Sequence, residues 1–200
     1  MDTKYQLIWE RAKPYLNTRS NDTHTWYCYY FAEQLCESYH DANRDIVLPA
    51  ILLHDVGWST VPEDKQLQSF GPHMIYPELR RQHETEGVRI ASEVLRSVGY
   101  VDDKIAKITQ IIDGHDTRKQ SLSLDDSLVK DADKLWRYTP FGLETVGRWF
   151  NFTHDEQLAL LKKWVGTRFY TDAGRDMARG LYAYLQILDH KGAENTEKSK

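Results

Sequence analysis

The sequence has few cysteines and no long apolar run. Cys28 and Cys36 lie eight residues apart on one predicted helix, roughly 12 Å apart and too far for a disulfide. The longest apolar segment, IVLPAILL at 46–53, is far shorter than the roughly 20 residues of a membrane-spanning helix. The N-terminus lacks the basic and apolar regions of a signal peptide. We therefore expect a cytoplasmic protein with free thiols and no membrane attachment.

The sequence also lacks a strong positive charge and several common motifs. Its formal net charge of −4 argues against a general nucleic-acid or membrane-surface binder, so we expect no extended nucleic-acid surface. The chain contains no P-loop, no GxGxxG and no GxSxG. Nucleotide binding through a glycine-rich loop and serine hydrolase chemistry therefore have no support.

The patterns that are present predict an all-α protein of eight or nine helices. Apolar residues recur at helical spacing through most of the 200 residues, and strand-like alternation is not sustained anywhere. The length suits a single domain over 1–190, with a core at 20–140 and C-terminal helices at 141–190. Gly57 is expected to end the helix that contains 46–53, and 59–76 to form a loop or broken short helices. The polar residues 191–200 are expected to be a disordered tail.

Four histidines lie on helix faces that should point inward. His24 precedes an apolar stripe by one turn, His54 ends the stripe of 46–53, and His83 and His115 each continue the apolar side of a helix. Asp55 directly follows His54. Burying such groups costs a few kcal/mol each unless they are paired. A metal ion would offset this cost, because neutral imidazole and carboxylate are both good ligands.

The segment DADKLW at 131–136 offers another carboxylate, but the pattern leaves its identity open. Asp131 and Asp133 fall about equally far from the centre of the apolar stripe, on opposite sides of the helix. Periodicity alone does not choose between them.

The ordered set of His24, then His54-Asp55, then an aspartate in a late helix resembles the signature of the HD-domain superfamily of metal-dependent phosphohydrolases. The segments HETEGVRIASEVL (83–95), IIDGHD (111–116) and DADKLW strengthen the resemblance, which covers about residues 20–140. It implies an all-helical fold. It also implies that Asp133 is the late ligand, with Asp131 as a supporting group or the alternative.

Family members with two metals add histidines from the two intervening helices, where His83 and His115 stand. The resemblance therefore implies a dinuclear centre. One ion would bind His24, His54 and Asp133, the other would bind His83 and His115, and Asp55 would bridge them. Nitrogen-rich ligation with two carboxylates favours Fe, Mn, Co, Ni or Zn over magnesium.

The implied activity is hydrolysis of a small phosphorylated substrate, such as a nucleotide, by metal-activated water. Asp55 and Lys134 are the expected catalytic residues. Arg80, Arg81 and Lys134 are the expected contacts to substrate phosphate. Asp116, beside a predicted ligand, is a candidate for moving a proton or orienting an imidazole, whereas Glu84 is turned about 100° from His83 and is expected to be unimportant.

Two other interpretations of the same ligand set remain: a mixed-valent diiron oxygenase, found in a minority of HD proteins, and a non-catalytic metal-binding regulatory module. The aromatic C-terminal helices are expected to pack on the core. A homodimer face or a base-stacking wall is the alternative for them.

Overall fold

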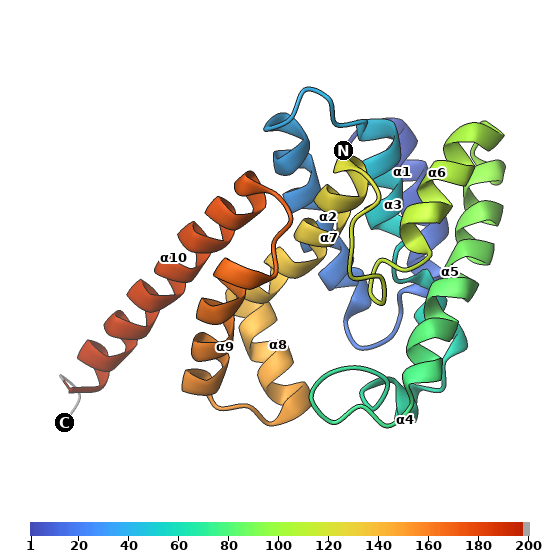
Figure 1. The fold of residues 1–200 in the computed structure, drawn as a ribbon. Coiled ribbons are helices and arrows are strands. Elements are labelled where there is room, and N and C mark those ends of the chain that lie inside the picture. Colours follow the sequence, from blue (N-terminus) through green and yellow to red (C-terminus); the bar gives the residue numbers. More distant parts are fainter. Residues whose placement is uncertain (198–200) are drawn as a thin grey trace.

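The computed structural model describes residues 1–197 and consists of helices, as the sequence predicted (Figure 1). This part of the chain holds ten α-helices rather than eight or nine, because four residues of the 59–76 segment form the short helix α4. The elements are α1 (Thr3–Ala12), η1 (Lys13–Tyr15), α2 (Asn21–Glu37), α3 (Arg44–Leu53), η2 (Val56–Thr60), α4 (Glu63–Gln66), α5 (Pro77–Ser97), α6 (Asp102–Ile112), α7 (Leu124–Leu135), η3 (Trp136–Tyr138), α8 (Pro140–Phe150), α9 (His154–Thr167) and α10 (Asp172–Glu197).

Helix α3 lies at the centre of the fold. Every residue from Ile46 to Leu53 is buried, as expected of a helix that is apolar on all sides. Helices α2, α6 and α7 pack against it. Because His54 and Asp55 follow its last turn, the chain carries this polar pair directly out of the most buried helix.

The sequence analysis expected Gly57 to end α3, but α3 already ends at Leu53. Gly57 lies inside the 3-10 helix η2 and allows η2 to approach α5 closely. A Cβ atom at Gly57 would lie 1.9 Å from the carbonyl oxygen of His83 and 2.6 Å from the backbone nitrogen of Gly87. The missing side chain therefore lets η2 pack directly on the backbone of α5. Through this contact, the segment after the His-Asp pair is fixed against the helix that carries His83.

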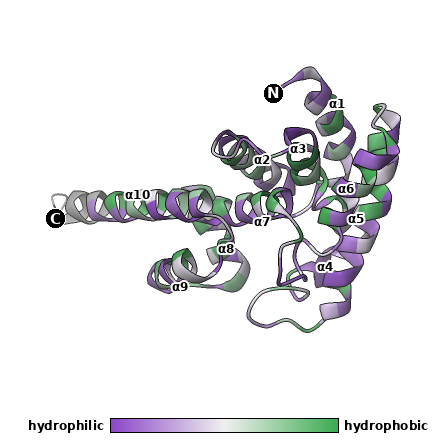
Figure 2. Cartoon of the chain, turned by 45° about the horizontal axis from the view of Figure 1, so that its top comes forward, coloured by the Kyte–Doolittle hydropathy of each residue, from purple (hydrophilic) through white to green (hydrophobic). Residues whose placement is uncertain are grey.

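The C-terminal helices form a second group beside α7. Helix α9 begins with a capping box formed by Thr153 and Glu156. Helix α10 contacts α7 and α9, with Asp189 of α10 paired to His154 of α9, and its far end projects away from the rest of the molecule (Figures 1 and 2).

Residues 191–197, which the sequence analysis assigned to a disordered tail, are helical in the structure. Helix α10 continues through these residues to Glu197, because adding a residue to an existing helix is far easier than starting a new one. Residues 198–200, also assigned to the tail, lie outside the described residues. No helix of the described chain is both long and apolar enough to cross a lipid bilayer.

Candidate metal centre

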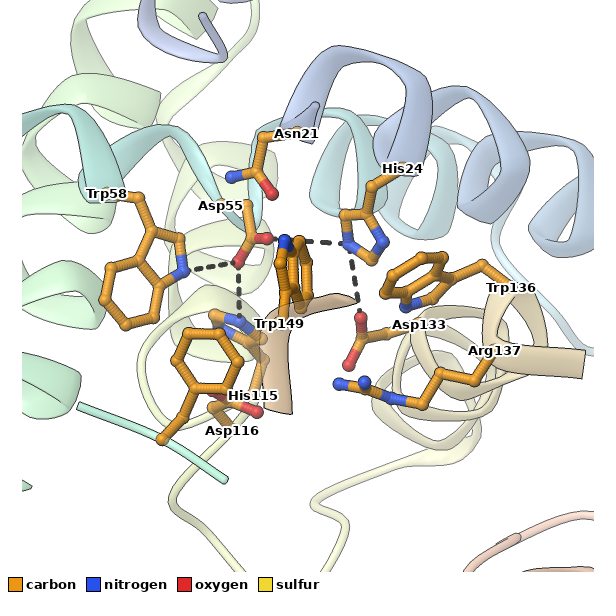
Figure 3. Close-up of a pocket in the computed structure, with 11 residues that line it drawn as sticks. Asn21, His24, Asp55, Trp58, His115, Asp116, Asp133, Trp136, Arg137 and Trp149 are labelled. Atoms are coloured by element: carbon orange, nitrogen blue, oxygen red, sulfur yellow. Dashed lines mark hydrogen bonds and ion pairs between the residues drawn. The ribbon is translucent and has the colours of Figure 1, made fainter. Parts of the chain in front are cut away.

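Six side chains that the sequence singled out come together at the centre of the molecule. Figure 3 shows His24, Asp55, His115 and Asp133 among them. The six side chains come from five segments that are far apart in the sequence. The four histidines and Asp55 are buried, and Asp133 is partly buried. They are His24 on α2, His54 and Asp55 after α3, His83 on α5, His115 after α6, and Asp133 on α7.

Four of the donor atoms form one tight cluster. The Nε2 atoms of His24 and His54 are 3.1 Å apart. Asp55 Oδ2 lies 3.5 Å from His24 Nε2 and 3.6 Å from His54 Nε2. Asp133 Oδ1 lies 3.4 Å and 3.6 Å from the same two nitrogens. Two imidazoles and two carboxylates thus face a common point.

The other oxygen of Asp55 faces a second cluster. Asp55 Oδ1 lies 3.4 Å from His115 Nε2 and 3.9 Å from His83 Nε2, and these two nitrogens are 3.4 Å apart. A carboxylate oxygen of Asp116 is also within reach of a common ion with His83 and His115. Asp55 therefore lies between the two clusters and presents one oxygen to each.

These spacings fit transition-metal binding. Nitrogen and oxygen ligands lie about 2.0–2.2 Å from such an ion, so neighbouring ligand atoms are about 3–3.6 Å from each other. The first cluster falls in this range throughout, and in the second the single longer separation is the 3.9 Å from Asp55 to His83. The buried cluster can therefore hold a divalent metal.

The imidazole rings are oriented by the backbone and by aromatic stacking. His54 Nδ1 donates to the carbonyl oxygen of Ile51 at 2.7 Å, and His115 Nδ1 donates to that of Ile112 at 3.0 Å. These bonds leave the Nε2 lone pairs facing the clusters, which is the arrangement of a metal-binding histidine. The ring of His83 instead lies flat against Trp58, with centroids 4.1 Å apart.

The charge state of Asp55 follows from its neighbours. Burial alone would raise the pKa of this carboxyl, but the facing His54, His115 and His24 outweigh it and hold the pKa well below its usual range. Trp58 Nε1 also donates to Asp55 Oδ1 at 3.2 Å. Asp55 is therefore ionised and has both oxygens directed before any ligand binds.

Cys28 lies beside the first cluster, with its Sγ 3.6 Å from both ring nitrogens of His24. Complete burial and the charges of Asp133 and Asp55 raise the pKa of the Cys28 thiol well above its usual value. Without a bound ion Cys28 is therefore a neutral thiol, and its Sγ is close enough to His24, His54 and Asp133 to share an ion with them.

A small cavity opens onto both clusters (Figure 3). Its free volume is about 40 Å³, room for a few water molecules. The walls combine the charged side chains of the centre with a set of aromatic rings. They are lined by Asn21, His24, Asp55, Trp58, Phe70, His115, Asp116, Asp133, Trp136, Arg137 and Trp149.

The family model of the HD domain matches residues 21–137, more than half of the chain. The chain belongs to the HD-domain family. The resemblance inferred from the sequence is thereby confirmed. No curated protein matches the chain.

The fold also occurs in a solved structure. The chain is similar to the crystal structure, at 1.45 Å resolution, of a predicted HD superfamily hydrolase from an uncultured Thermotogales bacterium. The two share 18% sequence identity and a TM-score of 0.64 over 94% of this chain and 91% of that one. At this identity the likeness concerns the fold alone, and it agrees with an all-α HD domain.

The structure distinguishes Asp131 from Asp133, the two candidates for the late metal ligand between which helical periodicity could not choose. Asp133 faces His24 and His54 in the first cluster. Asp131 faces the opposite way and accepts hydrogen bonds from the backbone nitrogen of Tyr170 and from the backbone nitrogen and hydroxyl of Thr171, at 2.8–2.9 Å. Asp131 thus fixes the segment that starts α10.

The residues expected to bind phosphate are already engaged with protein groups. Arg80 donates to the carboxylate of Asp116 at 3.2 Å and to its carbonyl oxygen at 2.8 Å. Arg81 pairs with Glu84 and Asp113. Lys134 Nζ donates to the carbonyl oxygen of Lys130 and lies over the ring of Tyr170. The cavity lining contains none of these three cations and contains Arg137 instead.

Two charged residues fix the loop of His115 and Asp116: Lys130, which sequence reasoning missed, and Glu84, which it expected to be unimportant. Lys130, 1% exposed, donates from Nζ to the carbonyl oxygens of Gly114, His115 and Arg118 at 2.9–3.1 Å. Glu84, fully buried, accepts from the backbone nitrogens of Asp116 and Thr117 and from the Thr117 hydroxyl.

Both residues belong to helices with few apolar positions, where a charged side chain predicts a solvent-facing surface. Glu84 points about 100° away from His83 around the helix. In that direction it meets the loop of Asp116 and Thr117 rather than solvent. The sequence holds no signal for such a contact, because it depends on where a loop from elsewhere in the chain comes to lie.

Proposed function

We propose that this HD domain is a dinuclear metal-dependent phosphohydrolase that cleaves a phosphate ester or anhydride of a small molecule. The observation that carries the proposal is the position of Asp55, whose two oxygens face two separate sets of histidines. A carboxylate that bridges two ions is typical of two-metal phosphoryl-transfer sites.

The ligands divide between two ions. His24, His54 and Asp133 would hold the first ion, and His83 and His115 the second, with Asp55 shared. Asp116, whose carboxylate is oriented by Arg80, is a further oxygen donor for the second ion. Four imidazoles among the donors favour Mn, Fe, Co, Ni or Zn over magnesium.

The proposed reaction is the hydrolysis of a phosphorus–oxygen bond. The oxygen of water joins phosphorus, the bond to the leaving oxygen breaks, and the leaving oxygen takes up a proton. Divalent ions, when bound, polarise the phosphoryl group and lower the pKa of water towards neutrality. The protein's part is to fix its ligands and to limit the water around them.

The structure of the site supports these two roles. The backbone contacts of His54 and His115 fix the direction of their Nε2 atoms, which strengthens ligation. The aromatic rings of Trp58, Phe70 and Trp149 cover the cavity. Their low polarity strengthens electrostatic interactions within the site.

An assay with defined metals tests the proposal. Purified full-length protein would be stripped of metal, reloaded separately with Mn, Fe, Co, Ni or Zn, and tested for phosphate release from monoesters, diesters and nucleotides. We expect hydrolysis with at least one metal and a loss of at least about 100-fold in Asp55→Ala. His154→Ala is the matched control, because His154 is exposed and far from the clusters in sequence and pairs with Asp189.

The other outcomes point to the alternatives. Oxygen consumption by the iron-loaded protein, without phosphate release, would favour a diiron oxygenase. Metal binding without any turnover would favour a regulatory module.

Because Cys28 and Cys36 are buried and unpaired, we propose a reducing compartment, the cytoplasm, for this protein.

A further inference from the structure

Two buried donors that line the cavity have no hydrogen-bond partner. Asn21, at the first turn of α2, is 2% exposed, and its Nδ2 is unpaired. Trp136, at the end of α7, is 1% exposed, and its indole Nε1 is unpaired. An unsatisfied buried donor costs about 1–3 kcal/mol, so a ligand in the cavity that reached these two side chains and supplied acceptors would relieve that cost.

Arg137 adds a cation to the same wall. Its guanidinium lies over the rings of Trp136 and Trp164, 5.3 Å and 5.7 Å from the centroids, which holds the side chain in one orientation. Figure 3 shows this side chain extending towards the space beside Asp133. In the part of the chain that the structure describes, no carboxylate pairs with Arg137, in contrast to Arg80 and Arg81.

A second arginine lies just behind the aromatic wall. The guanidinium of Arg19 is 4.6–5.5 Å from the ring centroids of Trp58, Phe70 and Trp149, and its Nη2 is buried without a partner. Burial is the main cause that lowers the pKa of Arg19 to about 10, and the charge of Arg137 adds to it. The carboxylates of Asp55 and Asp116 act in the opposite sense and favour the charged guanidinium of Arg19, and an anion bound between Arg19 and Arg137 would favour it further.

The backbone places Arg19 at a cost. Arg19 and Ser20 have φ angles of 49° and 61°. These angles lie in the left-handed region, where a residue other than glycine is destabilised by about 1–3 kcal/mol. The buried Gln66 then accepts from Arg19 Nε, while its own amide nitrogen donates to two backbone carbonyl oxygens. The backbone strain at Arg19 and its hydrogen bond to Gln66, which also accepts from the Thr18 hydroxyl, support a functional role for this position.

We propose that Asn21, Trp136 and Arg137 form a receptor for the free oxygens of a phosphoryl group, with the charge of Arg19 behind it, and that the substrates are phosphate monoesters. This inference rests on the proposed function. The metal clusters would face one side of the phosphoryl group and the receptor the other. In a diester, an oxygen facing the receptor would carry a second organic group, which cannot accept charge-assisted hydrogen bonds as strongly.

The size of the cavity agrees with this assignment. About 40 Å³ of free space between the cavity walls suits a compact group such as a phosphoryl group. The aromatic residues Phe70 and Trp149, at the cavity wall, offer planar surfaces to the single organic group of a monoester.

Equilibrium binding of inorganic phosphate to the metal-loaded protein tests the receptor apart from turnover. We expect calorimetry to show binding to the wild type, and affinity at least about tenfold weaker in Arg137→Ala. Arg137→Lys should recover little, because ammonium lacks the planar fork. Asn21→Ala should also weaken binding. Metal content should be unchanged in all three variants, and Arg148→Ala, an exposed arginine on α8, is the matched control.

The same variants separate failure of the receptor from failure of the proposed function. Unchanged phosphate affinity in both Arg137→Ala and Asn21→Ala, with metal retained, would overturn the receptor even if esters are hydrolysed. Arginine-dependent phosphate binding without turnover of any ester would support the receptor and overturn the hydrolase. If esters are hydrolysed, p-nitrophenyl phosphate must exceed bis(p-nitrophenyl) phosphate in kcat/KM, and a preference for the diester would contradict the monoester assignment.

Discussion

Asp131 and Asp133 lie two residues apart on α7 and point to opposite sides of it, one to the start of α10 and the other to the histidines of the metal centre. Gly174 packs against this arrangement, because a Cβ there would lie 2.5 Å from Asp131 Oδ2. One helix thus carries a structural carboxylate and a candidate ligand carboxylate within one turn.

Exchanging each for alanine should separate the two roles. Asp131→Ala leaves three donors of Tyr170 and Thr171 without an acceptor, so we expect a loss of about 2–3 kcal/mol in the free energy of unfolding and normal metal content. Asp133→Ala should lose metal and retain most of the stability of the metal-free protein. Denaturant unfolding and elemental analysis of both variants check this, and equal effects on both quantities would contradict it.

The sequence was sufficient to predict the helices and the inward direction of the histidines. Both predictions follow from the spacing of apolar residues along each helix. His54 directly follows a helix that is apolar throughout, and His83 shares a face with apolar residues that pack in the core. Local patterns of this kind fix which face of a helix is buried.

What the sequence could not supply is the arrangement between segments. Lys130 and Glu84 are charged residues on amphipathic helices, and their contacts depend on a loop placed by the whole fold. The hydrogen bond from Arg80 to Asp116 depends on the same loop. Arg137 and Asn21 carry no sequence signal, because nothing local marks which polar side chains line a cavity.

Removing the Lys130 ammonium should destabilise the loop of His115. Lys130→Met leaves the carbonyl oxygens of Gly114, His115 and Arg118 without this donor, and we expect a loss of about 2–4 kcal/mol in the free energy of unfolding. Lys134→Met is the matched control one turn further along α7, since Lys134 makes a single such hydrogen bond. The two variants should differ by more than about 1 kcal/mol in urea unfolding; equal stability would show that Lys130 is not needed to fix the loop.

A methyl group at Gly57 should separate η2 from α5. The Cβ of Gly57→Ala would meet backbone atoms of His83 and Gly87, which cannot move without shifting the helix, so we expect a loss of at least about 2 kcal/mol in the free energy of unfolding. In contrast, Gly180→Ala in α10 has no atom within 4 Å of the new Cβ and should gain up to about 1 kcal/mol. Thermal unfolding of both variants checks the opposite signs; a neutral Gly57→Ala would show that the approach of η2 to α5 is not tight.

The ion pairs of Asp45 should contribute to stability above acidic pH. Hydrogen bonds from Lys104 and Lys4, with one from Tyr5, hold the pKa of this carboxyl well below its usual value of about 3.9. Because the pKa is lower in the folded protein, the contribution is present above the unfolded pKa and is lost as the pH falls through the folded one.

Asp45→Asn should therefore cost about 1 kcal/mol at pH 7, a value reduced by the partial exposure of all three charged side chains. The difference from the wild type should shrink as the pH falls below about 4. Urea unfolding of both proteins across this range measures it, and a difference that stays constant with pH would assign the effect to something other than the charge of Asp45.

The number of metal ions bound by single-ligand variants tests the central claim most directly. Elemental analysis of purified wild-type protein should give about two transition-metal ions per chain, and His24→Ala and His83→Ala should each retain about one, because each removes a ligand of one cluster. Asp55→Ala, which removes the shared carboxylate, should lower both occupancies. A wild-type protein that binds a single ion, with His83→Ala unchanged from it, would contradict the dinuclear centre.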